Sequence, residues 1–202
     1  MRSSLSLLLA FVAGLLTGRG RWLPEMILEA DPASYALALL LLLVGVTIGG
    51  SKETGSLVRE APRRILLLPA LVVAGTLLSV ALVSPLLPSL SLREALAVGA
   101  GFGYYSLSSV IAGQMGGATL GVLALLTNLM RELLTLLLAP LLARYLGGVA
   151  PIASGGATSM DTALPIISHF SGQEYAVTAI FSGIVLTVLA PLLITLFLSA
   201  GS

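Results

Sequence analysis

Three charged residues stand inside apolar stretches of the sequence, where an ionised side chain is expensive. Arg131 and Glu132 lie near the middle of the Leu-rich run 118–144, and Asp161 lies in the run 150–168. An ionised group at the centre of a bilayer costs about 2.5–3.5 kcal/mol on insertion scales and normally faces a bundle interior or a cavity. These residues are therefore expected to mark a transport pathway.

The neighbours of these residues suggest different roles for them. Adjacent helix positions point about 100° apart, so Arg131 and Glu132 need different partners. Asn128 and Thr135 share the helix face of Glu132, and this polar stripe is expected to line a polar cavity in which Asn128 binds substrate. A desolvated carboxyl group is easier to protonate, which favours Glu132, with Asp161, for substrate binding and proton coupling. Arg131 is expected to be a structural charge that pairs with Asp161 or with the C-terminal carbonyls of a broken half-helix; a pair that only locks helices is equally open.

Two segments are dense in glycine and hydroxyl residues, 98–117 and 150–165. Both are predicted to be broken or partly unwound, as in transporter helices that form binding sites at mid-membrane. A half-helix beginning at 155–159 would aim free N–H groups at a carboxylate, although these glycines also suit close helix packing. The expected substrate-binding residues in the two segments are Gly155, Gly156, Thr158, Ser159, Tyr104 and Ser106.

The elements that must position these residues follow from composition. Of 202 residues, 57% are hydrophobic and 9% charged, with a mean hydropathy of +1.06, against about 25% charged residues in soluble domains. We predict an all-α polytopic membrane protein in which residues 1–202 form one transmembrane transporter domain, and in which the first helix is retained rather than cleaved as a signal peptide. The apolar runs place about seven membrane segments, near 4–18, 34–51, 65–84, 94–113, 118–144, 150–168 and 174–199.

Charge and motif content narrow the function class. The basic connector 51–64 predicts a cytoplasmic N-terminus and, with seven crossings, an external C-terminus. The net charge of +1 and the lack of basic runs do not favour nucleic-acid binding. With no cysteine and one histidine we expect no metal site and no cofactor. No catalytic motif is found, so we expect no enzyme.

A short string recurs along the chain. LLAPLL at 137–142 returns as VLAPLL at 188–193, 51 positions later, and the same offset brings the glycine-rich segment near Phe102 onto the one near Ala153. This indicates a repeated unit, a broken helix followed by a long one. Chance similarity between leucine-rich helices is an equally open explanation.

Three ordered strings resemble those of a known family. GFGYYSLSS (101–109), TNLMRELLTLLLAP (127–140) and GGATSMDTALPII (155–167) are similar to segments of the LysO-type lysine exporter family, in the same order and at similar separations. The resemblance covers about residues 36–200. The sequence departs from longer family members, which have additional N-terminal spans and a further acidic position, so it looks like a short form.

The resemblance implies export of L-lysine and toxic lysine analogues across the bacterial inner membrane by exchange with an ion gradient. The intramembrane acidic positions of the family fall on Glu132 and Asp161, and Asn128 and Arg131 match the same motif. Expected partners are L-lysine or a related cationic amino acid, a proton or other coupling ion, membrane lipid, and a second copy or a separate small subunit. The alternatives are an uncoupled channel or permease for small cationic solutes, a non-transporting membrane scaffold, and an intramembrane enzyme.

Overall fold

The computed structural model describes residues 63–199, with side chains from residue 67 on, and before them only Thr17, Leu39, Leu42 and Val46. The chain divides into two compact units, residues 1–40 and 41–202, and every helix described below belongs to the second. The predicted segments 4–18 and 34–51, the retained first helix and the connector 51–64 lie outside the described residues, apart from these few positions. Their number and orientation stay predictions.

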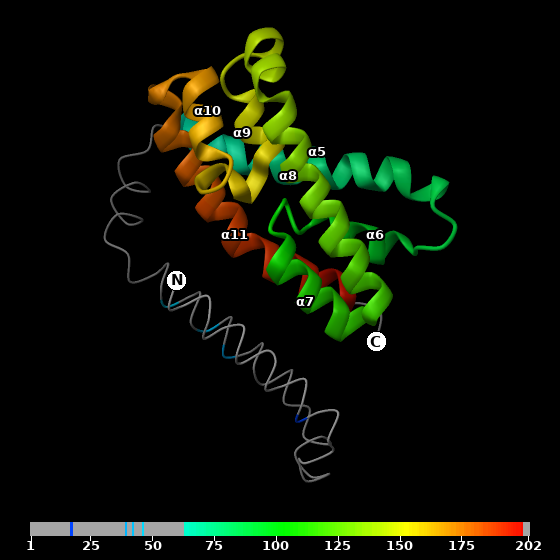
Figure 1. The fold of residues 1–202 in the computed structure, drawn as a ribbon. Helices are drawn as coiled ribbons and strands as arrows, with labels where there is room; N and C mark the ends of the chain where they lie inside the picture. Colours follow the sequence, from blue (N-terminus) through cyan, green and yellow to red (C-terminus); the bar gives the residue numbers. More distant parts are fainter. Residues whose placement is uncertain (1–16, 18–38, 40–41, 43–45, 47–62, 200–202) are drawn as a thin grey trace. The chain divides into compact units, whose positions relative to one another are not determined.

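Seven α-helices make up the described region, and no strand occurs within 63–199. Among the residues that the structure describes, three segments are long and apolar enough to cross a membrane, Leu67–Leu86, Ala118–Leu146 and Gln173–Ser199. They match the predicted spans 65–84, 118–144 and 174–199, which confirms an all-α membrane fold. The helices, shown in Figure 1, are α5 (Arg63–Val83), α6 (Leu92–Gly99), α7 (Tyr105–Gly116), α8 (Ala118–Leu146), α9 (Ala150–Gly155), α10 (Leu164–Ser171) and α11 (Ala176–Ser199), with 3-10 turns η1 (Ser84–Leu86), η2 (Gly156–Met160) and η3 (Gln173–Tyr175).

The first glycine-rich segment forms two short helices around a break. Helix α6 begins at a capping box, in which the Ser91 hydroxyl accepts from the Glu94 N–H and the Glu94 carboxylate accepts from the Ser91 N–H. It ends before Phe102 and Gly103, whose φ angles of +47° and +95° are incompatible with a right-handed helix. Helix α7 follows, and Gly117, at φ +88°, turns the chain into α8.

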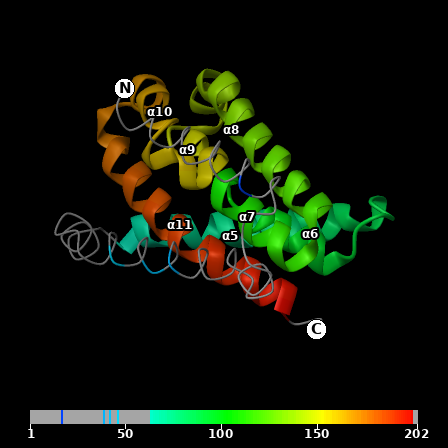
Figure 2. The same ribbon diagram turned by 60° about the horizontal axis from the view of Figure 1, so that its bottom comes forward.

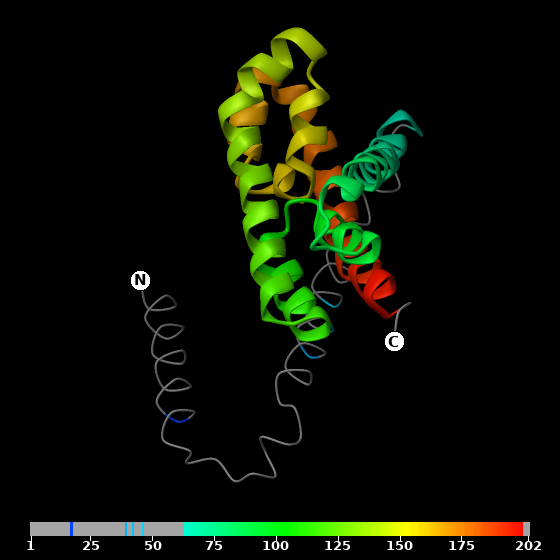
Figure 3. The ribbon, with the colours of Figure 1, turned by 90° about the vertical axis from the view of Figure 1, so that its right-hand side faces the viewer.

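The second glycine-rich segment is also broken. Helix α9 has six residues and stops at Gly156, where φ is +64°. Figures 1 and 3 show the chain turning back through η2, so that α10 returns toward the end of α8 from which α9 starts. At 1.5 Å per residue, α6 and α9 are each much shorter than the thickness of a hydrocarbon core, about 30 Å. The prediction of two broken segments is confirmed: each of the expected spans 94–113 and 150–168 consists of two short helices that form a hairpin around a break. The number of crossings stays a prediction.

Helices α8 and α11 hold the two hairpins. Helix α8 packs on α6, α7, α9 and α10, and α11 packs on α5, α6, α7, η2 and α10; Figure 2 shows α7 between α8 and α11. At the α7–α8 contact a Cβ on Gly121 would lie 2.8 Å from the Gly113 Cα and 2.9 Å from the Ser109 carbonyl oxygen. Small residues thus allow close helix approach, as is common in membrane proteins.

The order of these elements repeats. A broken helix followed by a long one occurs as α6–α7–α8 and again as α9–α10–α11, and each long helix has an internal proline, Pro140 and Pro191, 51 residues apart (191 − 140). The first break, 100–104, shifted by 51 gives 151–155, whereas the second non-α segment runs from 156 to 163. The order supports the repeated unit, with the second break displaced toward the C-terminus.

Candidate functional site

The two breaks contact each other at their turning points, Phe102–Gly103 and Gly156–Ala157, which we call the tips. The Ala157 N–H donates to the Phe102 carbonyl oxygen at 2.9 Å. A Cβ on Gly156 would overlap that same carbonyl, and a Cβ on Gly103 would lie 2.8 Å from the Gly155 carbonyl oxygen. Glycine is required on both sides of this contact. The sequence predicted both breaks, but it carried no signal that they touch.

Asn128 of α8 closes the first break. Its Oδ1 accepts from the Gly103 N–H at 2.8 Å, while Nδ2 donates to the Val98 carbonyl at 3.0 Å and to the Ala124 carbonyl at 2.9 Å. The side chain is 2% exposed, and Gly101 is small enough to let it approach. Asn128 therefore replaces hydrogen bonds that the interrupted helix loses. Its predicted contact with substrate stays a prediction.

Arg131 of α8 bonds to the end of α9, just before the second break. Its Nε donates to the Ser154 carbonyl at 2.8 Å and its Nη2 to the Ala153 carbonyl at 3.0 Å, both in the last turn of α9. Its Nη1 donates to the Thr76 hydroxyl of α5 at 3.2 Å. Of the two partners expected for Arg131, the half-helix carbonyls are present, while within 63–199 no salt bridge joins it to Asp161. Sequence reasoning missed Thr76, whose only signal was a hydroxyl within an apolar run.

Thr135 completes the link between α8 and α9. Its hydroxyl donates to the Arg131 carbonyl at 2.9 Å and shares a 2.7 Å hydrogen bond with the Ser154 hydroxyl. The predicted stripe of Asn128, Glu132 and Thr135 does share one buried face of α8, with exposures of 2%, 6% and 0%. However, Asn128 and Thr135 bond to backbone and side-chain groups of the two broken segments. The stripe was expected to line a cavity instead.

Glu132 lies between these links. Its Oε2 is buried and has no hydrogen-bond partner among the residues that the structure describes. Nearly all buried polar groups in proteins are paired, and an unpaired one calls for an explanation such as a bound ion or a catalytic role. Glu132 is thus a buried acceptor that is available to a cation or a proton, on the same face of α8 as Asn128 and Thr135, which bond to the two broken segments.

Asp161 follows η2 directly and is exposed at the second break. Its Oδ1 accepts from the Thr162 N–H at 2.6 Å and from the Thr162 hydroxyl at 3.3 Å. The Asp161 carboxylate also lies close enough to the Tyr104 hydroxyl for an electrostatic interaction. The structure therefore brings together predicted site residues from the two breaks. Ser106 is exposed in the first turn of α7.

The segment 155–159 differs from its prediction. Helix α9 ends at Gly155, the 3-10 helix η2 begins at Gly156, and the next α-helix begins only at Leu164. The half-helix that begins in this segment is therefore a short 3-10 helix. The reason is that the positive φ of Gly156 ends α9, leaving only a five-residue 3-10 turn. The Thr158 hydroxyl donates to the Gly155 carbonyl, and the Ser159 hydroxyl contacts the Gly156 and Ala179 carbonyls. Substrate binding by Gly155, Gly156, Thr158 and Ser159 is still a prediction.

Comparison with known proteins gives this arrangement a family. The model of the family described as "Lysine exporter LysO" matches residues 8–198 of this chain. "Lysine exporter LysO" of Escherichia coli K12 is 33% identical over 169 residues, 83% of this chain but only 55% of that relative. "Putative lysine exporter" of Haemophilus influenzae Rd is 33% identical over 197 residues, 96% of this chain and 97% of that relative. No solved structure matches.

The family match covers both hairpins, the three long apolar helices and the buried charges of α8. The chain belongs to the LysO family of lysine exporters.

Proposed function

We propose that this chain exports L-lysine and toxic lysine analogues across the bacterial inner membrane, in exchange for an ion that enters down its gradient. Two relatives are named for lysine export. The observation that carries the proposal is Glu132, a buried carboxyl group whose Oε2 has no hydrogen-bond partner among the described residues. It lies on the face of α8 from which Asn128 and Thr135 bond to the two broken segments.

Glu132 alternately holds the substrate ammonium group and the coupling proton. Either of these ligands supplies the donor that Oε2 lacks in this conformation. Asp161, exposed at the second break and near Tyr104, provides a second acidic group for the doubly ammonium-bearing substrate. Ser106 lies on the same α7 turn as Tyr104 and contributes a hydroxyl. Binding of a cation is favoured here because a buried carboxylate without a partner is costly.

The setting of the transporter forms part of this proposal. The N-terminus is cytoplasmic and the C-terminus external, in keeping with the basic connector 51–64. Exposed leucines on the long helices, such as Leu82, Leu137 and Leu192, suit contact with lipid. The chain spans about half of the Escherichia coli relative. A second copy or a separate small subunit as a partner is also part of the proposal.

The proposal is tested by efflux of labelled lysine from proteoliposomes with and without an imposed pH gradient. Coupled export slows when the gradient is collapsed, whereas an uncoupled permease continues to pass lysine down its own gradient. The Glu132→Gln variant should lose exchange, while Glu174→Gln, which removes an exposed acid in η3, should keep it. Export at the wild-type rate by Glu132→Gln would show that the role of Glu132 is wrong.

A further inference from the structure

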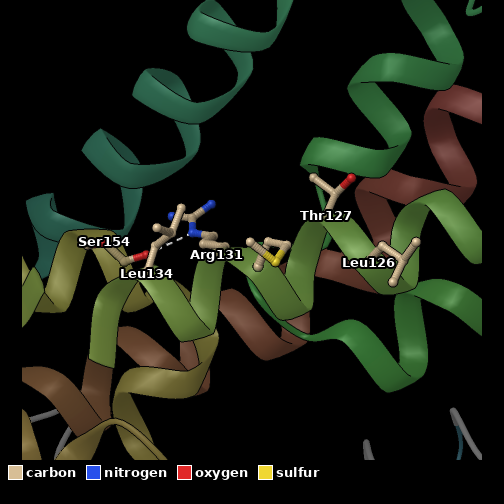
Figure 4. A pocket seen from close by; sticks show the side chains of 6 residues that line it. Leu126, Thr127, Arg131, Leu134 and Ser154 are labelled. Atoms are coloured by element: carbon tan, nitrogen blue, oxygen red, sulfur yellow. Dashed lines mark hydrogen bonds between the residues drawn. The ribbon is translucent and has the colours of Figure 1, made fainter. Parts of the chain in front are cut away.

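An open cavity of about 540 Å³ lies beside Arg131 on the face of α8 next to α9. Its size is within the range of small-molecule sites, about 300–1,000 Å³. Figure 4 shows Arg131 on its wall, with the Leu134 and Ser154 side chains on one side of it and Thr127 on the other. The lining residues are Leu126, Thr127, Met130, Arg131, Leu134 and Ser154.

The guanidinium group keeps unused donors at this cavity. An arginine has five N–H donors, and three of them are bonded here, one each on Nε, Nη1 and Nη2. One N–H on each terminal nitrogen has no acceptor within the described part of the chain. Two N–H groups on the terminal nitrogens of one guanidinium match the two oxygens of a carboxylate.

The charge of Arg131 is also uncompensated among the described residues. All three of its acceptors are neutral oxygens, of Ala153, Ser154 and Thr76. Its sequence neighbour Glu132 lies on the buried face of α8 rather than on the cavity wall. The carbonyl end of α9 supplies only a partial negative charge. A full cation in an apolar setting is stabilised by an anion, which the cavity has room to admit.

We propose that this cavity is the subsite for the carboxylate of the transported amino acid, with Arg131 as the residue that binds it. The inference rests on the proposed export of lysine. The bonds to α9 and α5 fix the guanidinium. Leu126, Met130 and Leu134, each about half exposed, offer apolar contact to the substrate methylenes. The backbone segment 155–159 is a poorer anion site in this conformation, because the Ala157 N–H already bonds to Phe102.

The subsite makes Arg131 a determinant of specificity. A substrate with a free carboxylate gains the charge-assisted pair, whereas an amide of the same shape does not. Lysine and lysinamide differ in this group alone and share both ammonium groups. The wild-type protein should therefore have a lower KM for lysine than for lysinamide.

The test is uptake of both compounds into everted vesicles, in which export appears as uptake. The Arg131→Gln variant should raise the KM for lysine about tenfold or more and leave the KM for lysinamide unchanged. Arg131→Lys keeps the positive charge but lacks the paired N–H groups of the guanidinium. Its KM for lysine should therefore fall between those of the wild type and Arg131→Gln. Arg144→Gln makes the same change at an exposed site on α8 and should alter neither KM.

Each outcome decides the question. An equal rise in both KM values, or a loss of rate alone, overturns the subsite and leaves Arg131 as a structural charge. Equal KM values for lysine and lysinamide in the wild type also overturn it, even if Arg131→Gln fails to fold, and they leave lysine export standing. Absence of lysine uptake by the folded wild type contradicts the proposed function itself.

Discussion

Removing the amide of Asn128 should destabilise the protein by an amount that follows from its contacts. The Asn128→Leu variant keeps most of the side-chain volume but leaves the Gly103 N–H without a partner in the described part of the chain. The Val98 and Ala124 carbonyls also lose the Nδ2 donor, but Val98 keeps the Gly101 N–H at 3.3 Å and Ala124 keeps its helical bond. Gly103 is buried, and a buried polar group that loses its partner costs about 1–3 kcal/mol. One such group predicts a loss of about 1–3 kcal/mol in the free energy of unfolding.

The assay is equilibrium unfolding in mixed micelles by SDS titration, followed by circular dichroism. The Thr127→Ala variant is the matched control, because Thr127 is the adjacent residue and is exposed; its effect should be within about 0.5 kcal/mol. The Asn128→Asp variant keeps an acceptor for Gly103 and loses the donor for Val98. Its penalty should shrink on acidification, because a protonated carboxyl group regains a donor.

Equal stability of Asn128→Leu and Thr127→Ala would refute this reasoning. It would mean that the first break is held by contacts other than the amide of Asn128. A penalty for Asn128→Asp that does not change with pH would likewise exclude the hydrogen bond to Val98 as the source of the loss.

Other substitutions test separate contacts, each by the thermal unfolding midpoint in detergent. Gly156→Ala should prevent folding because its Cβ overlaps the Phe102 carbonyl, whereas Gly117→Ala, with a positive φ but open space around it, should cost only about 1–3 kcal/mol; equal effects would contradict the tip contact. Ser91→Ala removes the capping box of α6 and should cost about 0.5–2 kcal/mol, and no loss would show that the cap is dispensable. Glu132→Leu removes an unpaired buried acceptor and should stabilise the protein by about 1 kcal/mol or more while abolishing exchange; a lower midpoint would point to an unseen partner.

Local signals in the sequence predicted much of this architecture. Hydropathy located α5, α8 and α11, because a membrane-spanning helix needs a long apolar run. Glycine and hydroxyl density located both breaks, and Gly103 and Gly156 indeed have positive φ. The spacing of Asn128, Glu132 and Thr135 predicted their common buried face, since helical periodicity fixes which residues share a face.

Contacts between distant segments could not be predicted in this way. Nothing local to Phe102 or Ala157 indicates that they bond to each other, and Thr76 is separated from Arg131 by 55 positions. The end of α9 does have a local signal in the sequence, because glycine is strongly enriched just after helix C-termini. That preference favours a helix that stops at Gly155–Gly156 over one that starts there, as the structure has it.

Helix α8 connects the two breaks through residues less than one turn apart. Asn128 bonds to the first tip and Arg131, three positions later, to the end of the second, while Thr135 adds a bond to Ser154 one turn further on. Three residues rise about 4.5 Å along a helix, so neither tip can move far relative to α8 without losing these bonds. Glu132 lies within the same stretch, on the buried face. A transport step that exposes Glu132 must therefore break bonds at one tip or carry both tips with α8, and the loss of either link should alter access to Glu132.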